Sequence, residues 1–145
     1  MESKNRNEGF SLVELVIVIA IMAILVALLA PQYIKYVEKS KITTDSELIS
    51  DIHDVIGVAI TDENIERRPL DGIPSTTIES MDPSNQYPDF MAQIQNDLGG
   101  ASLSTIKDRL QSRNFKGQPI MVEITSLQQV TVTVTSPDGS SSIQW

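Results

Sequence analysis

One continuous apolar segment near the N-terminus limits what this 145-residue chain can fold into. From Leu12 to Ala30 the only polar residue is Glu14, and 13 of these residues are Leu, Ile or Val. As a helix, the stretch from Phe10 to Ala30 spans about 32 Å, and the hydrocarbon core of a bilayer is about 30 Å thick. No glycine or proline interrupts the segment before Pro31. We therefore expect residues 10–30 to form one unbroken membrane-spanning helix.

The segment does not have the features of an ordinary secretory signal. It is longer than the usual apolar region of about 7–15 residues, and Leu28-Leu29-Ala30 lacks the small outer residue of a cleavage site. The flanking charges leave the orientation open, because Lys4 and Arg6 precede the segment and Lys35, Lys39 and Lys41 follow it. A retained anchor is therefore the better interpretation, with its direction undetermined by charge.

Glu14 is the residue that needs an explanation. It lies only about 6 Å along the helix from Phe10, so its carboxylate can extend to the lipid headgroups. Alternatively, an ionisable group in a spanning helix has a functional partner. No Lys or Arg lies on the same helix face within one turn. Such a partner would belong to another chain, or would be a new amine made by cutting this chain just upstream.

The residues around this acid carry a resemblance to a known family. The stretch Glu8-Gly9-Phe10-Ser11-Leu12-Val13-Glu14, followed by sixteen apolar residues, resembles the class III leader and N-terminal helix of type IV pilins. The resemblance covers about residues 2–40. It implies that a prepilin peptidase cuts between Gly9 and Phe10 on the cytoplasmic side and that the new Phe10 amine is then N-methylated. The leader, residues 1–9, would be removed, and the rest of the chain would lie outside.

The resemblance also implies a function and partners. The chain would be a type IV pilin precursor, a structural subunit and not an enzyme, that starts as a single-pass membrane protein and ends in an extracellular pilus. Glu14 of one subunit would meet the Phe10 amine of a neighbour during assembly. The implied partners are other copies of the chain, membrane lipid, the prepilin peptidase/N-methyltransferase, an inner-membrane platform protein and a cytoplasmic motor ATPase.

Three alternatives to a major pilin stay open at this point. A pseudopilin of a type II secretion or competence apparatus has the same N-terminal segment, so residues 1–40 do not separate it from a pilin. A minor tip pilin is disfavoured by the presence of Glu14. An uncleaved, membrane-anchored extracellular binding domain would keep residues 1–9 in the mature protein.

The helix is expected to continue beyond the membrane. Pro31 lacks an N–H group, so we expect a kink near it, and the resemblance implies a segment there that can unwind. Over residues 31–62 apolar residues recur at helical spacing, which predicts an amphipathic continuation. These apolar residues are Ile42, Leu48, Ile49, Ile52, Val55, Ile56, Ala59 and Ile60.

Residues 63–145 are expected to form a globular head. Residues 63–88 are rich in turn signals and predict a long surface connection, with an extended piece near Thr76–Ser80. Helices are predicted at Pro88–Leu98, closed by two glycines, and at Ser102–Ser112. The alternating apolar residues of 120–124 and 130–134, the turn at Pro137-Asp138-Gly139 and a last strand at Ser141–Trp145 predict about three antiparallel strands. The expected fold class is α+β and pilin-like, with a long helix, first membrane-spanning and then amphipathic, packed against a small C-terminal antiparallel sheet.

Composition excludes several other classes of function. The chain has no cysteine, which excludes disulfides, zinc fingers and thiol catalysis, and its net charge of −8 argues against nucleic-acid binding. No cofactor, metal site or catalytic residue is expected. His53 is the only histidine, and the oxygen ligands between Asp82 and Asp89 lack the spacing of an EF-hand.

Charge is unevenly distributed along the chain. Residues 45–97 contain twelve acids and two arginines, a net charge of −10, whereas residues 98–145 contain four bases and three acids, a net charge of +1. A solvated acidic surface is the favoured interpretation, because exposed ion pairs are individually weak. The alternative is that basic residues of one subunit pair with the acids of a neighbour; the candidates are Lys107, Arg109, Arg113 and Lys116.

Overall fold

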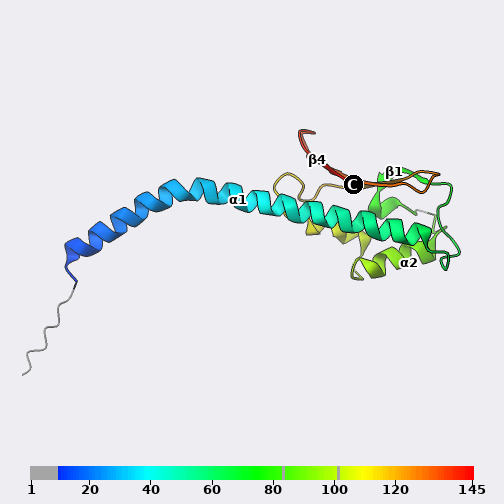
Figure 1. Ribbon diagram of the computed structural model, residues 1–145, viewed down its shortest axis with the longest axis horizontal. Helices are drawn as coiled ribbons and strands as arrows, with labels where there is room; N and C mark the ends of the chain where they lie inside the picture. The colour runs from blue at the N-terminus through cyan, green and yellow to red at the C-terminus, as the bar shows by residue number, and fades with distance from the viewer. Residues whose placement is uncertain (1–9, 83, 101) are drawn as a thin grey trace, which may run out of the picture. The chain divides into compact units, whose positions relative to one another are not determined.

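The computed structural model describes residues 10–82, 84–100 and 102–145. They fall into two compact units, one that ends at Val37 and one that comprises Glu38–Trp145. A single helix, α1 (Leu12–Thr61), contributes residues to both units (Figure 1). The expected long helix is therefore present, and it ends one residue before the predicted Asp62.

The first unit contains the first half of α1 and buries none of it. Every residue from Phe10 to Tyr36 is exposed. Pro31 lies inside the helix and does not end it. Within the described residues, α1 is the one helix that is long and apolar enough to cross a membrane.

The second half of α1 is amphipathic, as its spacing predicts. Its buried apolar residues recur every three or four positions, so they form one stripe along the helix. They are Leu48, Ile49, Ile52, Ile56, Ala59 and Ile60. The exception is Asp45, which is completely buried although its charge predicts an exposed position.

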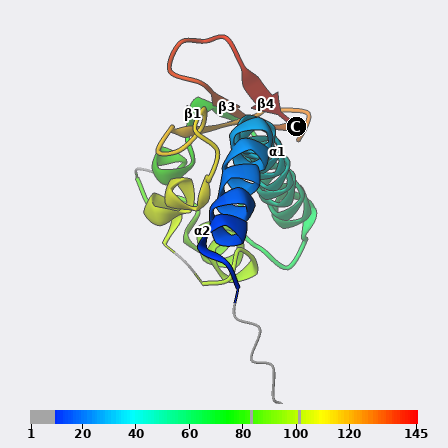
Figure 2. The same cartoon turned by 90° about the vertical axis from the view of Figure 1, so that its left-hand side faces the viewer.

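The second unit also contains a four-stranded antiparallel sheet in the order β1-β2-β3-β4. The strands are β1 (Ile73–Thr77), β2 (Ile120–Ile124), β3 (Val130–Thr135) and β4 (Ser142–Gln144). Within the second unit the sheet lies along one side of the second half of α1, and Figure 2 shows strands β1, β3 and β4 on that same side. The expected packing of the long helix against a small antiparallel sheet is confirmed.

Strand β1 was predicted only in part: the extended piece expected near Thr76–Ser80 overlaps its last two residues, and Ile78–Ser80 forms a 3-10 helix instead. Pro74 cannot donate a backbone hydrogen bond, and a proline inside a run demotes it as a strand candidate. Because β1 is the edge of the sheet, it can accommodate a residue without an N–H group, and its pairing with β2 is irregular between Ile73 and Thr76. The sheet therefore has four strands instead of about three.

The connection that follows α1 is less exposed than predicted. Four of its apolar side chains, Ile65, Ile73, Ile78 and Met81, are buried in the core. It contains β1 and a short 3-10 helix, η1 (Ile78–Ser80). The turn signals between these residues mark separate short bends, not one long surface loop.

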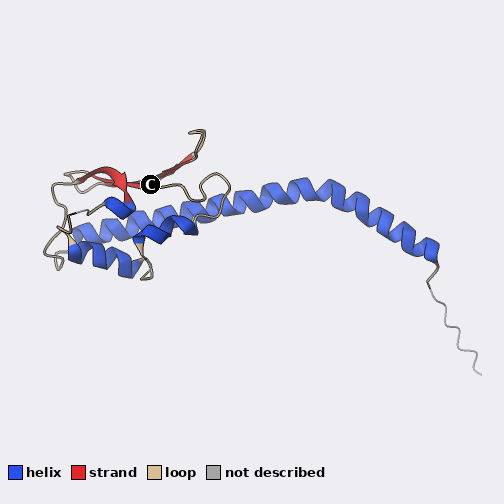
Figure 3. Cartoon of the chain, turned by 180° about the vertical axis from the view of Figure 1, so that it is seen from behind, coloured by secondary structure: helices blue, strands red, loops and turns tan. Residues whose placement is uncertain are grey.

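Two further helical segments complete the second unit (Figure 3). The predicted helix from Pro88 is present as α2 (Pro88–Asp97). The predicted helix over Ser102–Ser112 is a shorter 3-10 helix, η2 (Leu103–Arg109), and the chain becomes extended at Leu110. That change frees the next backbone N–H groups for the carboxylates of α1, as described below.

The core forms where α1, the sheet and the shorter helices meet. Phe90 of α2 and Phe115, which follows η2, are its largest fully buried side chains. Val122 and Val132 pair across β2 and β3 and are completely buried. The second unit thus has a core of its own, and it holds its last strands without a disulfide.

Candidate functional site

The N-terminus of α1 is closed by two side chains. The Ser11 hydroxyl accepts a hydrogen bond from the Val13 N–H at 3.3 Å, and the Glu14 carboxylate accepts one from the Ser11 N–H at 2.8 Å. This reciprocal arrangement is similar to a capping box, with the Val13 N–H in place of the Glu14 N–H, and it satisfies backbone donors that a helix N-terminus leaves free. The carboxylate also lies at the positive end of the helix dipole. The sequence Ser11-Leu12-Val13-Glu14 contains the Ser-x-x-Glu signal for this cap, which was not among the sequence predictions.

The predicted cleavage position lies just before this cap. Gly9 is outside the described residues, as is the rest of the predicted leader. Phe10 is 93% exposed and lies outside regular secondary structure. A new amine at Phe10 would precede the capping residue Ser11 by one position, and Glu14 is the carboxylate in the first helical turn.

Beyond the cap, the first half of α1 presents apolar side chains to solvent on all its faces. Leu, Ile, Val and Met side chains between positions 12 and 29 are 47–77% exposed. Contiguous apolar surface of this extent is not stable in water, so lipid or other protein chains must cover it. Covering one such side chain fully contributes about 1.5–3 kcal/mol. Covering many such side chains therefore makes this surface a large source of binding free energy.

Pro31 lies within this exposed part of the helix. Its ring nitrogen carries no hydrogen, so the Ala27 carbonyl, four residues earlier, lacks the usual intrahelical donor. The helix continues through this position. A kink or unwinding at Pro31 stays a prediction.

Within the second unit, two carboxylates of α1 bind the segment that follows η2. Asp45 accepts hydrogen bonds from the backbone N–H groups of Gln111 (2.7 Å) and Ser112 (2.9 Å), and Glu38 accepts one from the N–H of Arg113. Three successive donors are thus satisfied by a helix more than sixty residues earlier in the chain. Hydrogen bonds to a charged acceptor are about twice as strong as neutral ones. No local pattern identifies Asp45, because its partners are distant in sequence.

The other polar residues considered from the sequence have local roles. The Asp82 carboxylate accepts hydrogen bonds from the N–H groups of Gln86 and Tyr87, both at 2.7 Å, just before α2. His53 Nδ1 lies 3.1 Å from Asp54 Oδ1. Across residues 10–82, 84–100 and 102–145 no group of three or more His, Cys, Asp and Glu residues is placed to hold a metal ion.

The turn before β4 contains an aspartate with a perturbed pKa. The hydroxyl of Ser136, with the backbone N–H and hydroxyl of Ser140, lowers the pKa of Asp138 from 3.8 to about 2. These donors bind the ionised form and so favour it. Asp138 thus organises the turn that positions β4 beside β3, as the Pro137-Asp138-Gly139 sequence predicts.

Comparison with known proteins identifies the N-terminal segment. Residues 4–30 match the family described as the prokaryotic N-terminal methylation motif. No curated protein and no solved structure shows a significant match to the chain. The front of the chain is therefore a type IV pilin-like class III signal followed by an apolar helix, which confirms the resemblance seen in the sequence.

Proposed function

We propose that this chain, which carries the N-terminal methylation motif at residues 4–30, is the precursor of a pilin-like structural subunit of a helical surface filament. The observation that carries the proposal is the coexistence of that motif with an apolar half-helix that is entirely exposed. The lipid bilayer would cover this half-helix first. Copies of the same half-helix would cover it after assembly.

Processing would act at the start of the half-helix. A prepilin peptidase/N-methyltransferase would cut between Gly9 and Phe10 and methylate the new amine. The cut would remove the basic leader and keep the anchor, so the head would stay tethered on the outer side of the membrane. An inner-membrane platform protein and a cytoplasmic motor ATPase would supply the machinery and energy that move subunits from lipid into the filament.

Glu14 would have two successive partners in this process. Before assembly its carboxylate would accept the hydrogen bond from the Ser11 N–H that the structure contains. In the filament it would pair with the Phe10 amine of a neighbouring subunit, surrounded by apolar helices. Because an unpaired charge there would cost several kcal/mol, the pair would fix the register between subunits.

Mass spectrometry of sheared surface material tests the function. We expect the chain to be abundant in filaments and to begin at N-methylated Phe10. Material that still begins with Met1 and stays in the membrane fraction would contradict the proposal and support the uncleaved anchored domain.

Electron microscopy of the cell surface and a deletion strain address the pseudopilin alternative, which uses the same N-terminal processing. Long filaments on the cell surface support the pilin. A short structure confined to the cell envelope, together with loss of secretion or DNA uptake on deletion, supports the pseudopilin.

Glu14 variants separate its two roles. Glutamine preserves the capping box, because Gln can accept the Ser11 N–H, but removes the charge. We expect Glu14→Gln and Glu14→Ala to be inserted and cut, and both to give much less filament than wild type. Wild-type filament yield from Glu14→Gln would show that the charge is not needed, and would contradict the proposed pair.

A further inference from the structure

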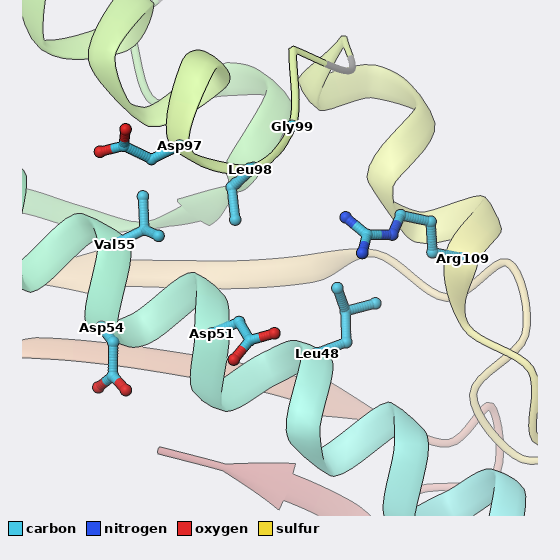
Figure 4. A pocket seen from close by; sticks show the side chains of 8 residues that line it. All are labelled: Leu48, Asp51, Asp54, Val55, Asp97, Leu98, Gly99 and Arg109. Atoms are coloured by element: carbon cyan, nitrogen blue, oxygen red, sulfur yellow. The ribbon is translucent and has the colours of Figure 1, made fainter.

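A groove in the second unit is lined by residues of α1, α2 and η2. It has a volume of about 390 Å³ and lies between the middle of the second half of α1 and the C-terminal end of α2 (Figure 4). Its apolar walls are Leu48, Val55 and Leu98. Asp51, Asp54, Asp97 and Arg109 also line it, which gives it a formal net charge of −2.

The groove has one source of negative potential besides this count. The C-terminal end of α2 carries the negative end of the helix dipole, and no basic residue in its last turn compensates it. Asp97, which is already included in the count, is the last residue of that helix and places its carboxylate at the same end. His53 Nδ1 lies 3.1 Å from Asp54 Oδ1, and the Gln93 amide donates a hydrogen bond to Asp97 Oδ2 at 2.9 Å. The Asp51 carboxylate and the second oxygen of Asp97 are therefore the acidic groups most available to a ligand. A cation on an apolar stem matches both the charge and the apolar walls.

We propose that this groove binds Lys35 and Lys39 of a second copy of the chain. The inference rests on the proposed function, because it requires copies to lie side by side in a filament. Lys35 and Lys39 are both exposed and are four residues apart on α1, so they lie on one face of the helix. Tyr36 beside them is 71% exposed, and tyrosine is enriched in protein interfaces.

The position of these lysines favours them over the other basic residues. They follow directly after the exposed apolar surface, and covering that surface brings another copy against α1 at the adjoining positions. Lys107 has a partner within its own chain, since its ammonium lies 3.0 Å from Glu79, and Arg109 lines the groove itself. In the part of the chain that the structure describes, neither Lys35 nor Lys39 forms an ion pair. Arg67 and Lys116 are exposed as well, and they serve as the control positions.

Zero-length cross-linking of wild-type filaments tests the contact without any substitution. A carbodiimide joins a lysine directly to a carboxylate that it touches, and mass spectrometry identifies the joined peptides. Lys39 and Asp51 are twelve residues apart on one helix, or about 18 Å, so a link between them must join two copies. We expect Lys35 or Lys39 linked to Asp51 or Asp97. Links from these acids only to other lysines would overturn the proposal.

Charge reversal gives a second test with a matched control. Lys35→Glu/Lys39→Glu and Asp51→Lys/Asp97→Lys should each lower the yield of sheared filament about fivefold or more. The chain that carries all four changes should recover filament, because the pairs are restored with opposite sign. Arg67→Glu/Lys116→Glu makes the same change of charge as the lysine variant and should leave the yield near wild type.

The outcomes separate this inference from the proposed function. Filaments that form without these links, or that respond equally to the control variant, overturn the contact and leave the pilin proposal intact. Absence of filaments from the wild-type chain overturns the pilin proposal itself. If Lys35 and Lys39 serve only to contact lipid headgroups, their reversal would impair membrane insertion, and the fourfold variant would not recover filament.

Discussion

The two halves of α1 differ both in their content of apolar residues, which is higher in the first half, and in how they use them. The first half exposes apolar side chains on all its faces, whereas the second half gathers them in one stripe that the sheet and shorter helices cover. The second half also carries carboxylates that bind backbone donors of the head. A single helix thus has one part stabilised by contacts within the chain and another that depends on contacts outside it. Substitutions in the two parts should therefore have separable effects.

The largest difference is expected between a core residue of the second unit and an apolar residue of the first. Phe90→Ala removes a completely buried ring and should lower the free energy of unfolding by about 3–5 kcal/mol. Ile24→Ala, at a position that is 62% exposed, should leave it nearly unchanged. Denaturant unfolding of the full chain in detergent micelles measures both. Equal destabilisation by the two variants would mean that the halves are not independent.

A smaller effect is expected at the buried carboxylate that joins the head to α1. Asp45→Ala leaves the N–H groups of Gln111 and Ser112 without acceptors and should cost about 2–4 kcal/mol. Asp51→Ala, which changes an exposed acid on the same helix, should stay within about 0.5 kcal/mol of wild type. The same unfolding measurement compares them. If Asp45→Ala lowers the free energy of unfolding no more than Asp51→Ala does, these hydrogen bonds do not hold the head on α1.

Gly72 tests how closely the connection after α1 packs on the sheet. Its φ is +87°, and a Cβ there would lie 2.5 Å from the Ile124 carbonyl oxygen. Gly72→Ala should therefore cost about 2–3 kcal/mol, with both strain and overlap contributing. Gly139→Ala has a similar φ of +69° but open space around it, so only strain of about 1–2 kcal/mol is expected. If the two alanine variants lower the free energy of unfolding equally, a small shift of the backbone relieves the close approach at Gly72.

The smallest effect concerns the turn before β4. Because folding lowers the pKa of Asp138 from 3.8 to about 2, its contribution to stability is present above pH 3.8 and is lost as the pH falls through about 2. Carboxyl-carbon NMR of the full chain in micelles should show this titration. Ser136→Ala removes the largest cause of the shift and should move the pKa of Asp138 back toward 3.8. An unchanged pKa in that variant would assign the shift to Ser140.

Local patterns predicted much of the fold. The apolar run, the spacing of three and four residues over 42–60, and the alternation in β2 and β3 each depend on neighbouring residues, so the helix and central strands were predicted close to their observed bounds. The bounds of edge strand β1 were not predicted, because Pro74 argues against a strand. The proline is acceptable there only because β1 lies at an edge of the sheet. Segment 102–112 was predicted as a helix, but Leu110 is extended because the following N–H groups bind α1.

The N-terminal part of the site can be read from the sequence because its chemistry is local. The N-terminal methylation motif, the cap formed by Ser11 and Glu14, and the apolar segment all lie within about twenty residues of one another. The burial of Asp45 and the groove beside Asp97 depend on residues that are far apart in the chain and meet only when the head folds on α1. Linear order therefore determined the class III signal and the apolar helix that follows it. Tertiary packing decided which charges of the head are used internally and which face outward, because burial and hydrogen bonding depend on distances that no sequence interval specifies.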